Sequence, residues 1–246
     1  MKKIIIYCVF FLIPELLWAI YPVVHNFSRK ESNAGTQNWD VIQRRNNWMY
    51  FANNHGLLEY DGYHWTTYPI GNQTNIRSLY YDEEEDRIYA GAFNEFGYYH
   101  RDKQGLLKYN SLMDGLSPPD LNFNEIWHIH RNSESLFFQG EREVFRMKDG
   151  RIRKLNFPHK IESSGVVYDI LVISTIEDGI LALNGDLFIP LPGGELLKEK
   201  KVCSILPVNE RDILFVTVLH GMFLYNGESI KPYHTDLDDF LHENRI

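Results

Sequence analysis

The sequence predicts an all-β protein made of four-stranded units that recur along the chain. One outline, with a strand, a corner, a second strand and a turn, spans Trp48 to Gly62 and returns four more times. Aromatic residues form 14% of the chain, and they suit a pleated, half-buried surface. Pairs such as Asp61-Gly62 and Asn184-Gly185 between apolar runs are strong hairpin signals, because type I′ turns need positive φ at both central residues.

The spacing of these units distinguishes between repeat architectures. Equivalent positions are separated by steps of 41, 46, 36 and 42 residues, and they are Gly56, Gly97, Glu143, Gly179 and Gly221. A period of about 40 residues built from short strands indicates a β-propeller, since helical repeats of similar size require 3.6-residue periodicity. We therefore expect five blades of a ring of seven or more, and their ranges are 39–70, 75–112, 124–157, 161–192 and 201–234.

The N-terminal residues predict export. Two lysines precede an apolar run at 4–13, and residues 17–19 resemble a cleavage end, so we interpret residues 1–19 as a signal peptide. An uncleaved membrane anchor is the alternative, because Trp18 and Ile20 extend the apolar character. In residues 20–38, we expect Tyr21 to Phe27 to form a strand that closes the ring by completing the last blade, followed by a polar loop.

The C-terminal residues predict a sixth blade. Asn244-Arg245-Ile246 is similar to the segments at which earlier repeats begin, so we expect the chain to be a truncated or fragmentary product; a natural five-bladed ring is the alternative. An incomplete ring would expose a blade edge, which predicts poor solubility or a homodimer.

Charge and cysteine content exclude several classes of function. The net charge is −8, and it becomes −9 without residues 1–19, so nucleic acid is a poor partner for this segment. Cys203 is the only cysteine after the signal, which excludes an internal disulfide in the mature chain. No stretch after residue 20 is long and apolar enough to span a bilayer, so a membrane link would come from an uncleaved signal or from parts absent from this sequence. No motif calls for a cofactor.

The repeats resemble a known family. Three segments are similar to the two-component regulator propeller repeat: Trp48 to Asp61, Ile88 to Tyr98 and Ile213 to Asn226. That repeat has a Leu-Trp-Ile-Gly-Thr-like strand, then two residues, then Gly-Leu, and it ends in Tyr-Asp or Tyr-Asn. The resemblance covers about residues 39–246, and the central strand motif is altered in each segment, for example to Tyr89-Ala90-Gly91-Ala92.

The resemblance carries functional implications. It implies the periplasmic sensor of a transmembrane regulator, of the hybrid histidine kinase or helix-turn-helix type, which responds to oligosaccharides. No output domain occurs in this sequence.

The corners between the second and third strands of each blade are the expected ligand-binding positions. In a propeller these corners lie on one face together with the links between blades, and converging polar groups there would bind a hydroxyl-rich ligand. The candidate corner residues are Asn53, Asn54, His55, Asn94, Glu95, Glu141, Arg142, Glu177, Asp178 and His220. The links add Asn72, Gln73, Asn75, Asn122, Asn124, Ser163 and Ser164. The alternative is that these are solvated turn residues, since Asn, Asp and Gly favour turns whatever the function.

Other constellations are weaker. His128 and His130 share a strand face, but without a third ligand they indicate packing beside Trp127 and no metal site. The leading hypothesis is an exported, non-enzymatic sensor segment that binds oligosaccharide or another small ligand. The alternatives are a protein-interaction scaffold and an exported enzyme acting on polysaccharide through Glu141 or Glu177.

Overall fold

The computed structural model describes residues 24–236, 238 and 240. These residues form twenty strands in five four-stranded antiparallel sheets, which we call blades 1 to 5 in chain order. Blade 1 contains β1 (Asn38–Gln43), β2 (Met49–Asn53), β3 (Gly56–Tyr60) and β4 (Trp65–Tyr68). Blade 2 contains β5 (Ile76–Asp82), β6 (Arg87–Ala92), β7 (Glu95–Arg101) and β8 (Leu107–Ser111). Blade 3 contains β9 (His128–Arg131), β10 (Leu136–Gln139), β11 (Glu143–Lys148) and β12 (Arg151–Asn156).

The same plan continues in the second half of the chain. Blade 4 contains β13 (Ser163–Val167), β14 (Ile170–Thr175), β15 (Gly179–Asn184) and β16 (Leu187–Pro190). Blade 5 contains β17 (Val202–Pro207), β18 (Ile213–Thr217), β19 (Met222–Tyr225) and β20 (Ile230–Tyr233). Within residues 24–236 the short helices are α2 (Arg29–Ser32) and three 3₁₀ turns at Met113–Gly115, Pro118–Asp120 and Gly194–Leu197.

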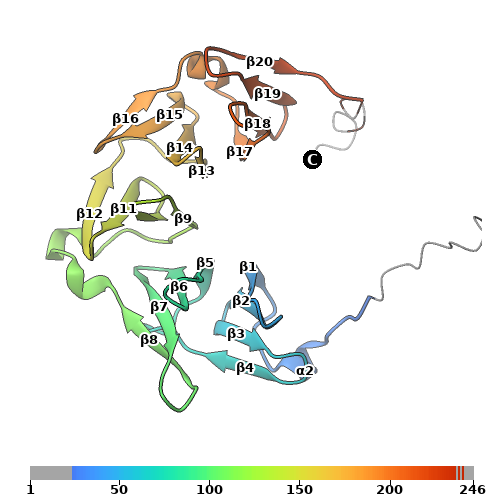
Figure 1. Cartoon of the computed structure of the whole chain (residues 1–246), viewed down its shortest axis with the longest axis vertical. Coiled ribbons are helices and arrows are strands. Elements are labelled where there is room, and N and C mark those ends of the chain that lie inside the picture. Colours follow the sequence, from blue (N-terminus) through green and yellow to red (C-terminus); the bar gives the residue numbers. More distant parts are fainter. Residues whose placement is uncertain (1–23, 237, 239, 241–246) are drawn as a thin grey trace, which may run out of the picture.

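The blades are arranged around a common axis. In Figure 1 the first strand of each blade lies on the inside and the fourth on the outside, and each outer strand leads to the inner strand of the next blade. The five blades form an arc that is open between blade 5 and blade 1 (Figure 1). This arrangement confirms the predicted β-propeller and its five blades.

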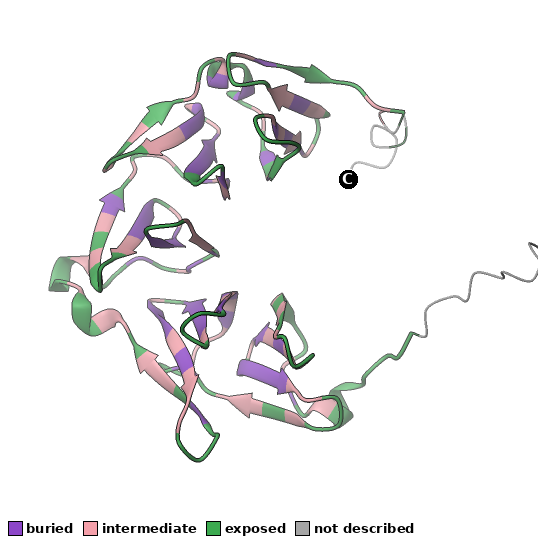
Figure 2. Ribbon diagram, viewed as in Figure 1, coloured by how far each residue is buried: buried purple, intermediate pink, exposed green. Residues whose placement is uncertain are grey.

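The core lies between neighbouring blades. Buried side chains occupy the central strands on the faces where blades meet (Figure 2). Tyr50 and Leu57 of blade 1 pack with Ile76 and Ile88 of blade 2, for example, and comparable clusters join each later pair of blades. Each blade therefore depends on its neighbours for burial, as expected of a repeat that cannot bury its apolar faces alone.

In blades 1 and 2 the recurring glycine of the third strand has a steric cause. Gly56 has a φ of +123°, and a Cβ at this position would lie 2.3 Å from the carbonyl oxygen of Tyr68. At Gly97 a Cβ would lie 2.2 Å from the carbonyl oxygen of Asn110. In these two blades the outer strand passes too close for any side chain, whereas blade 3 carries Glu143 at the equivalent position and a Cβ at Gly221 of blade 5 would meet nothing within 4 Å.

The N-terminal segment differs from its prediction. Residues 24–28 form no strand, while Tyr21 to Val23 lie outside the described residues. The Phe27 ring instead packs on Tyr60 and Trp65 of blade 1, with centroid distances of 5.0 and 5.1 Å. The physical reason is that these rings offer the segment an apolar surface within the nearest blade. The predicted signal peptide and the predicted start of a sixth blade also lie outside the described residues.

The part of the chain that the structure describes contains no helix with the length and apolar character needed to cross a bilayer.

Candidate functional site

The corners and the links between blades lie on one face, as expected. The Asn72 amide in the link after blade 1 donates to the carbonyl oxygen of Phe93 in the β6–β7 corner at 2.8 Å. In the next link, Phe123 and Asn124 donate their backbone N–H groups to Asn94 Oδ1 at 2.8 and 3.0 Å. We call this surface the corner face.

Several predicted site residues hold the fold together. Asn53 is fully buried, and its amide oxygen accepts from the N–H groups of Gly35 and His55 at 2.9 and 3.0 Å. Glu95 is buried and accepts hydrogen bonds from Tyr109 Oη and Ser111 Oγ at 2.9 and 2.8 Å. Burial raises the pKa of Glu95 above its ordinary value. Asn53 and Glu95, like Asn94, therefore form their hydrogen bonds within the protein.

The remaining corner residues are spread over several blades. His55, Arg142, Glu177 and His220 are exposed, whereas Asn54, Glu141 and Asp178 are half-buried. Asp178 lies 2.5 Å from His159 Nδ1, and Glu141 lies 3.8 Å from Lys160 Nζ. The contacts of these residues are local to each corner, so they do not form one group. Asn54 alone joins the cluster described next.

The inner strands of three blades bring two tryptophans and an arginine together on the corner face. Arg77 of β5 places its guanidinium carbon 3.8 Å from the ring centroid of Trp39 on β1. The same carbon lies 5.5 Å from the ring centroid of Trp127, which immediately precedes β9. Arg77 Nη2 also pairs with Glu125 Oε1 at 2.9 Å, and Trp39 Nε1 donates to Asn54 Oδ1 at 2.8 Å. We call these five residues the Trp–Arg cluster.

The Trp–Arg cluster contains partly exposed aromatic rings and buried polar atoms without hydrogen-bond partners. Trp39 and Trp127 are each 39% exposed, and their ring centroids lie 6.4 Å apart with the planes at 72°. Among the described residues, Arg77 Nε and Nη1 and Glu125 Oε2 are buried and have no hydrogen-bond partner. A buried polar atom without a partner in a native fold calls for an explanation, and a bound polar molecule or water would supply one.

Sequence reasoning missed this cluster. Trp39 and Arg77 are 38 residues apart, and Arg77 and Trp127 are 50 residues apart, so no local motif joins them. The sequence does show that Asn75-Ile76-Arg77 and Asn124-Glu125-Ile126 both lie where repeats begin. This position places their side chains at or next to the inner strands.

A histidine pair lies on the inner strand of blade 3. The rings of His128 and His130 stack at 5.8 Å, and His130 Nε2 lies 2.8 Å from Ser164 Oγ, which donates to Gln139 Oε1 at 2.8 Å. Partial burial, together with the neighbouring His128, lowers the pKa of His130 to about 4. No group of three or more His, Cys, Asp or Glu side chains suited to a metal ion was found in the described part of the chain.

His130 is expected to make the fold sensitive to acid. Because its pKa is about 4 in the folded protein and 6.5 ordinarily, only the unfolded chain gains a proton as the pH falls below 6.5. Neutral His130 therefore makes its whole contribution to the free energy of unfolding above pH 6.5. This contribution decreases between pH 6.5 and 4 and is constant below pH 4, with a total loss of roughly 2–3 kcal/mol. Urea unfolding of His130→Gln should show a correspondingly smaller loss over this range. An unchanged pH profile in the variant would contradict this assignment.

Comparisons with known proteins support the fold alone. No protein-family model matches the sequence, and a search of curated proteins gave no match. The structure is similar to the WD40 β-propeller domain of Doa1, with a TM-score of 0.61 and 13% identity over 78% of this chain and 66% of that chain.

Two bacterial extracellular domains are also similar. The extracellular domain of a protein of B. thetaiotaomicron described as a one component system gives a TM-score of 0.58 at 18% identity, over 79% of this chain and 27% of that chain. The extracellular domain of a hybrid two component system of the same organism also has a TM-score of 0.58. Its sequence identity is 12%, over 86% of this chain and 28% of that chain. The chain thus spans little more than a quarter of the length of these two proteins, and the family named by the sequence resemblance stays a prediction.

Proposed function

We propose that this chain is the ligand-sensing propeller segment of an exported signalling or transcriptional regulator, and that it binds oligosaccharide at the Trp–Arg cluster. The observation that carries the proposal is the pair of half-exposed indoles, Trp39 and Trp127, which flank Arg77 on the corner face. The similarity to extracellular domains of bacterial signalling systems and the predicted signal peptide favour a periplasmic location.

The chemistry of the cluster suits a sugar. Aromatic rings present large apolar faces on which the C–H face of a sugar ring can pack. Polar groups around them then fix orientation, as in most small-molecule sites. Here the Asn54 side chain and the exposed His55 lie close to the rings or to their corner and can bond hydroxyl groups. This set of groups carries no strong net charge, which favours a neutral oligosaccharide.

The position of the cluster also suits a sensor. Its residues come from blades 1, 2 and 3, so a ligand that contacts both indoles contacts two blade interfaces. A ligand can shift a conformational equilibrium only through its different affinities for the two states. We propose that the bound ligand favours one packing of these inner strands and that the complete receptor transmits this change.

A protein-interaction scaffold is the second candidate. The observation in its favour is that the outer strand β16 exposes apolar side chains, with Leu187 72% and Ile189 42% exposed. Propellers also include the WD40 domain of Doa1, to which the fold is similar. This candidate predicts a protein ligand at the outer edge and no response to saccharides.

A thermal-shift panel separates the two candidates. Neutral oligosaccharides of varied linkage, from two to eight sugars long, would be titrated against the purified chain, and a ligand specific for the folded state raises its Tm by mass action. We expect a saturable rise with one group of these sugars, and no product formation. A panel that leaves Tm unchanged at millimolar concentrations would reject the carbohydrate proposal.

A further inference from the structure

The outer hairpin of blade 3 carries four cations on one face. Strands β11 and β12 are joined at Asp149-Gly150, and their register places Arg146 directly opposite Arg153 and Lys148 directly opposite Arg151. We call these four residues the basic hairpin. Like charges placed directly opposite on neighbouring strands destabilise a sheet. The arrangement is the more unusual because the whole chain has a net charge of −8.

Neighbouring carboxylates offset only part of this charge. Asp186, in the turn between β15 and β16 of blade 4, pairs with both Arg146 and Arg153. Glu134 pairs with Lys148. Within the described residues, Arg151 has no ion pair, and one carboxylate serves two guanidinium groups. The basic hairpin therefore keeps an excess of positive charge and unused N–H donors.

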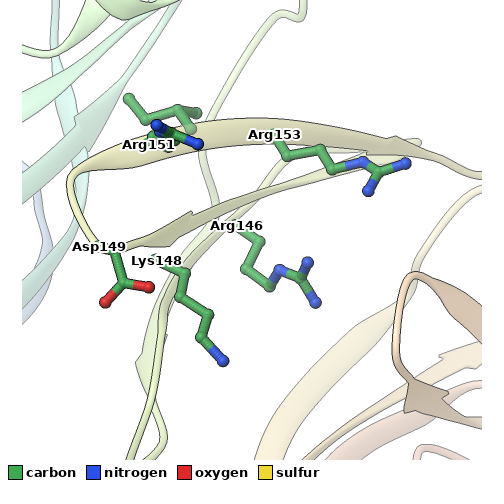
Figure 3. A pocket seen from close by; sticks show the side chains of 6 residues that line it. Arg146, Lys148, Asp149, Arg151 and Arg153 are labelled. Carbon is green, nitrogen blue, oxygen red and sulfur yellow. The ribbon is translucent and has the colours of Figure 1, made fainter.

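The same residues line an open pocket of about 800 Å³, together with Asp149 and Ile152. Figure 3 shows the charged ends of Arg146, Lys148 and Arg153 extending to the same side of the hairpin. The Arg146–Asp186 and Arg153–Asp186 pairs show that this side faces blade 4. The side chains of Arg153 and Lys148 are 65% and 42% exposed, so a molecule from solvent can contact them.

We infer that the basic hairpin binds a multiply charged oxyanion of the sulfate or phosphate type. Planar guanidinium groups bind such anions through two parallel N–H···O bonds, and these charge-assisted bonds are about twice as strong as neutral ones. The anion would bridge the two cross-strand pairs and remove the repulsion between them. The free ion and a sulfate ester on a glycan share this chemistry. The site lies on outer strands, whereas the Trp–Arg cluster lies on inner strands, so this inference does not depend on the proposed function.

The test compares two variants that remove the same number of positive charges. Lys148→Gln/Arg151→Gln removes half of the basic hairpin, while Lys30→Gln/Lys103→Gln removes two exposed lysines elsewhere. Calorimetric titration would use sodium sulfate, sodium pyrophosphate and a sulfated disaccharide, each against sodium chloride at equal ionic strength. We expect at least a tenfold loss of affinity in the hairpin variant and wild-type affinity in the control variant. A charge-preserving variant, Lys148→Arg/Arg151→Lys, should retain binding.

Thermal stability gives an independent readout. Without added anion, the hairpin variant should be as stable as the wild type or more stable, because a like-charge pair has been removed. Addition of sulfate should raise the Tm of the wild type and leave the hairpin variant unchanged. Binding of the free ions would identify a free oxyanion as a sufficient ligand, and binding of only the disaccharide would identify a sulfated glycan. Equal anion binding by wild type and hairpin variant, or no binding beyond that of chloride, would overturn the inference.

Discussion

Replacement of Arg101 by methionine is expected to lower the free energy of unfolding by roughly 3 kcal/mol, near the lower end of values for breaking a buried ion pair. Arg101 of β7 in blade 2 pairs with Glu59 of β3 in blade 1, whose side chain is only 8% exposed. Without the guanidinium, the Glu59 carboxylate would remain buried with no counter-charge. The lower end of the range applies because the Arg101 side chain is itself 23% exposed.

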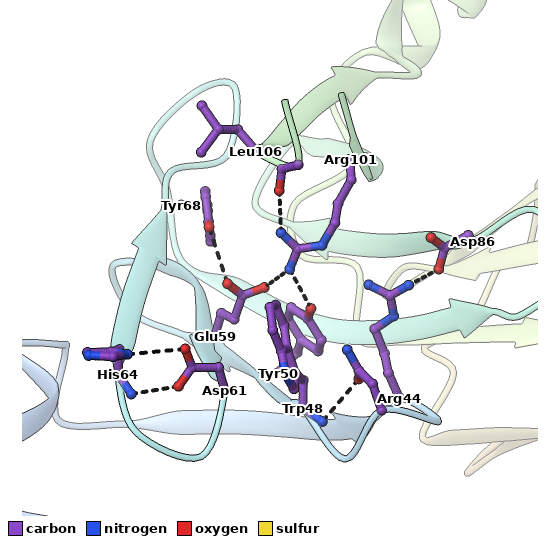
Figure 4. Close-up of polar contacts among 12 residues, drawn as sticks. Arg44, Trp48, Tyr50, Glu59, Asp61, His64, Tyr68, Asp86, Arg101 and Leu106 are labelled. Carbon is purple, nitrogen blue, oxygen red and sulfur yellow. Dashed lines mark hydrogen bonds and ion pairs between the residues drawn. The ribbon is translucent and has the colours of Figure 1, made fainter. Parts of the chain in front are cut away.

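The Arg101 guanidinium contacts several groups besides Glu59. Figure 4 shows its guanidinium between Glu59 and Tyr50, and Nη2 donates to the Tyr50 hydroxyl at 3.0 Å. Tyr68 Oη donates to Glu59 Oε1 at 3.2 Å, and the guanidinium carbon lies 4.7 Å from the centroid of the Trp48 ring. The network joins blade 1 to blade 2 near the outer edge, so its loss weakens the packing between the blades.

Chemical denaturation measures this effect, and a second variant isolates its cause. In Glu59→Gln/Arg101→Met the buried negative charge is also removed, so we expect the double variant to recover part of the stability lost in Arg101→Met. The two substitutions share one interaction and should therefore be clearly non-additive. A loss below about 1 kcal/mol in Arg101→Met, typical of an exposed pair, would show that this contact is solvated.

Replacement of Trp39 or Trp127 by alanine is expected to weaken oligosaccharide binding by at least 2 kcal/mol, or roughly 30-fold in Kd, as for a buried aromatic hot spot. Each substitution removes one of the two indole faces beside Arg77. Trp39→Phe keeps an aromatic face but loses the hydrogen bond to Asn54, so its effect should be smaller.

A matched control separates binding from general exposure of aromatic rings. Tyr63 is 89% exposed and lies in the turn before β4, away from the Trp–Arg cluster, so Tyr63→Ala should bind as the wild type does. Affinity would be measured by calorimetry with the sugar that gives the largest thermal shift. Full affinity in both tryptophan variants, with their folding verified by circular dichroism, would place the ligand elsewhere.

Much of the fold could be predicted because each blade is encoded locally. Gly56 is required because the outer strand passes beside it, and the hairpin turn at Asp149-Gly150 has positive φ at both residues. The turn type was wrong at Asp61-Gly62 and Asn184-Gly185, where only the glycine has positive φ. These constraints act within about forty residues and leave a visible period in the sequence. The placement of Phe27 against Tyr60 and Trp65 could not be predicted in this way, because Phe27 lies outside the repeats and its contacts follow no sequence period.

The candidate site was predictable only as a face of the molecule. The predicted corner residues share one face with the links between blades, yet Asn53 and Glu95 are buried and bonded within the fold. Repeat spacing shows where polar residues stand, but it does not show which of them bond to neighbouring backbone. Trp39, Arg77 and Trp127 meet only because three inner strands converge on one axis, so their contact depends on the curvature of the whole arc.

The central claim is that the Trp–Arg cluster is the ligand site, and NMR of the indole N–H groups tests it most directly. The indole signals of Trp39 and Trp127 would be assigned from single Trp→Phe variants and followed during titration with the stabilising oligosaccharide. We predict that both signals shift together and saturate with the Kd measured by calorimetry, while the signal of Trp65, which packs on Tyr60 at the far side of blade 1, stays in place. Saturable binding that leaves the Trp39 and Trp127 signals unchanged would contradict the claim.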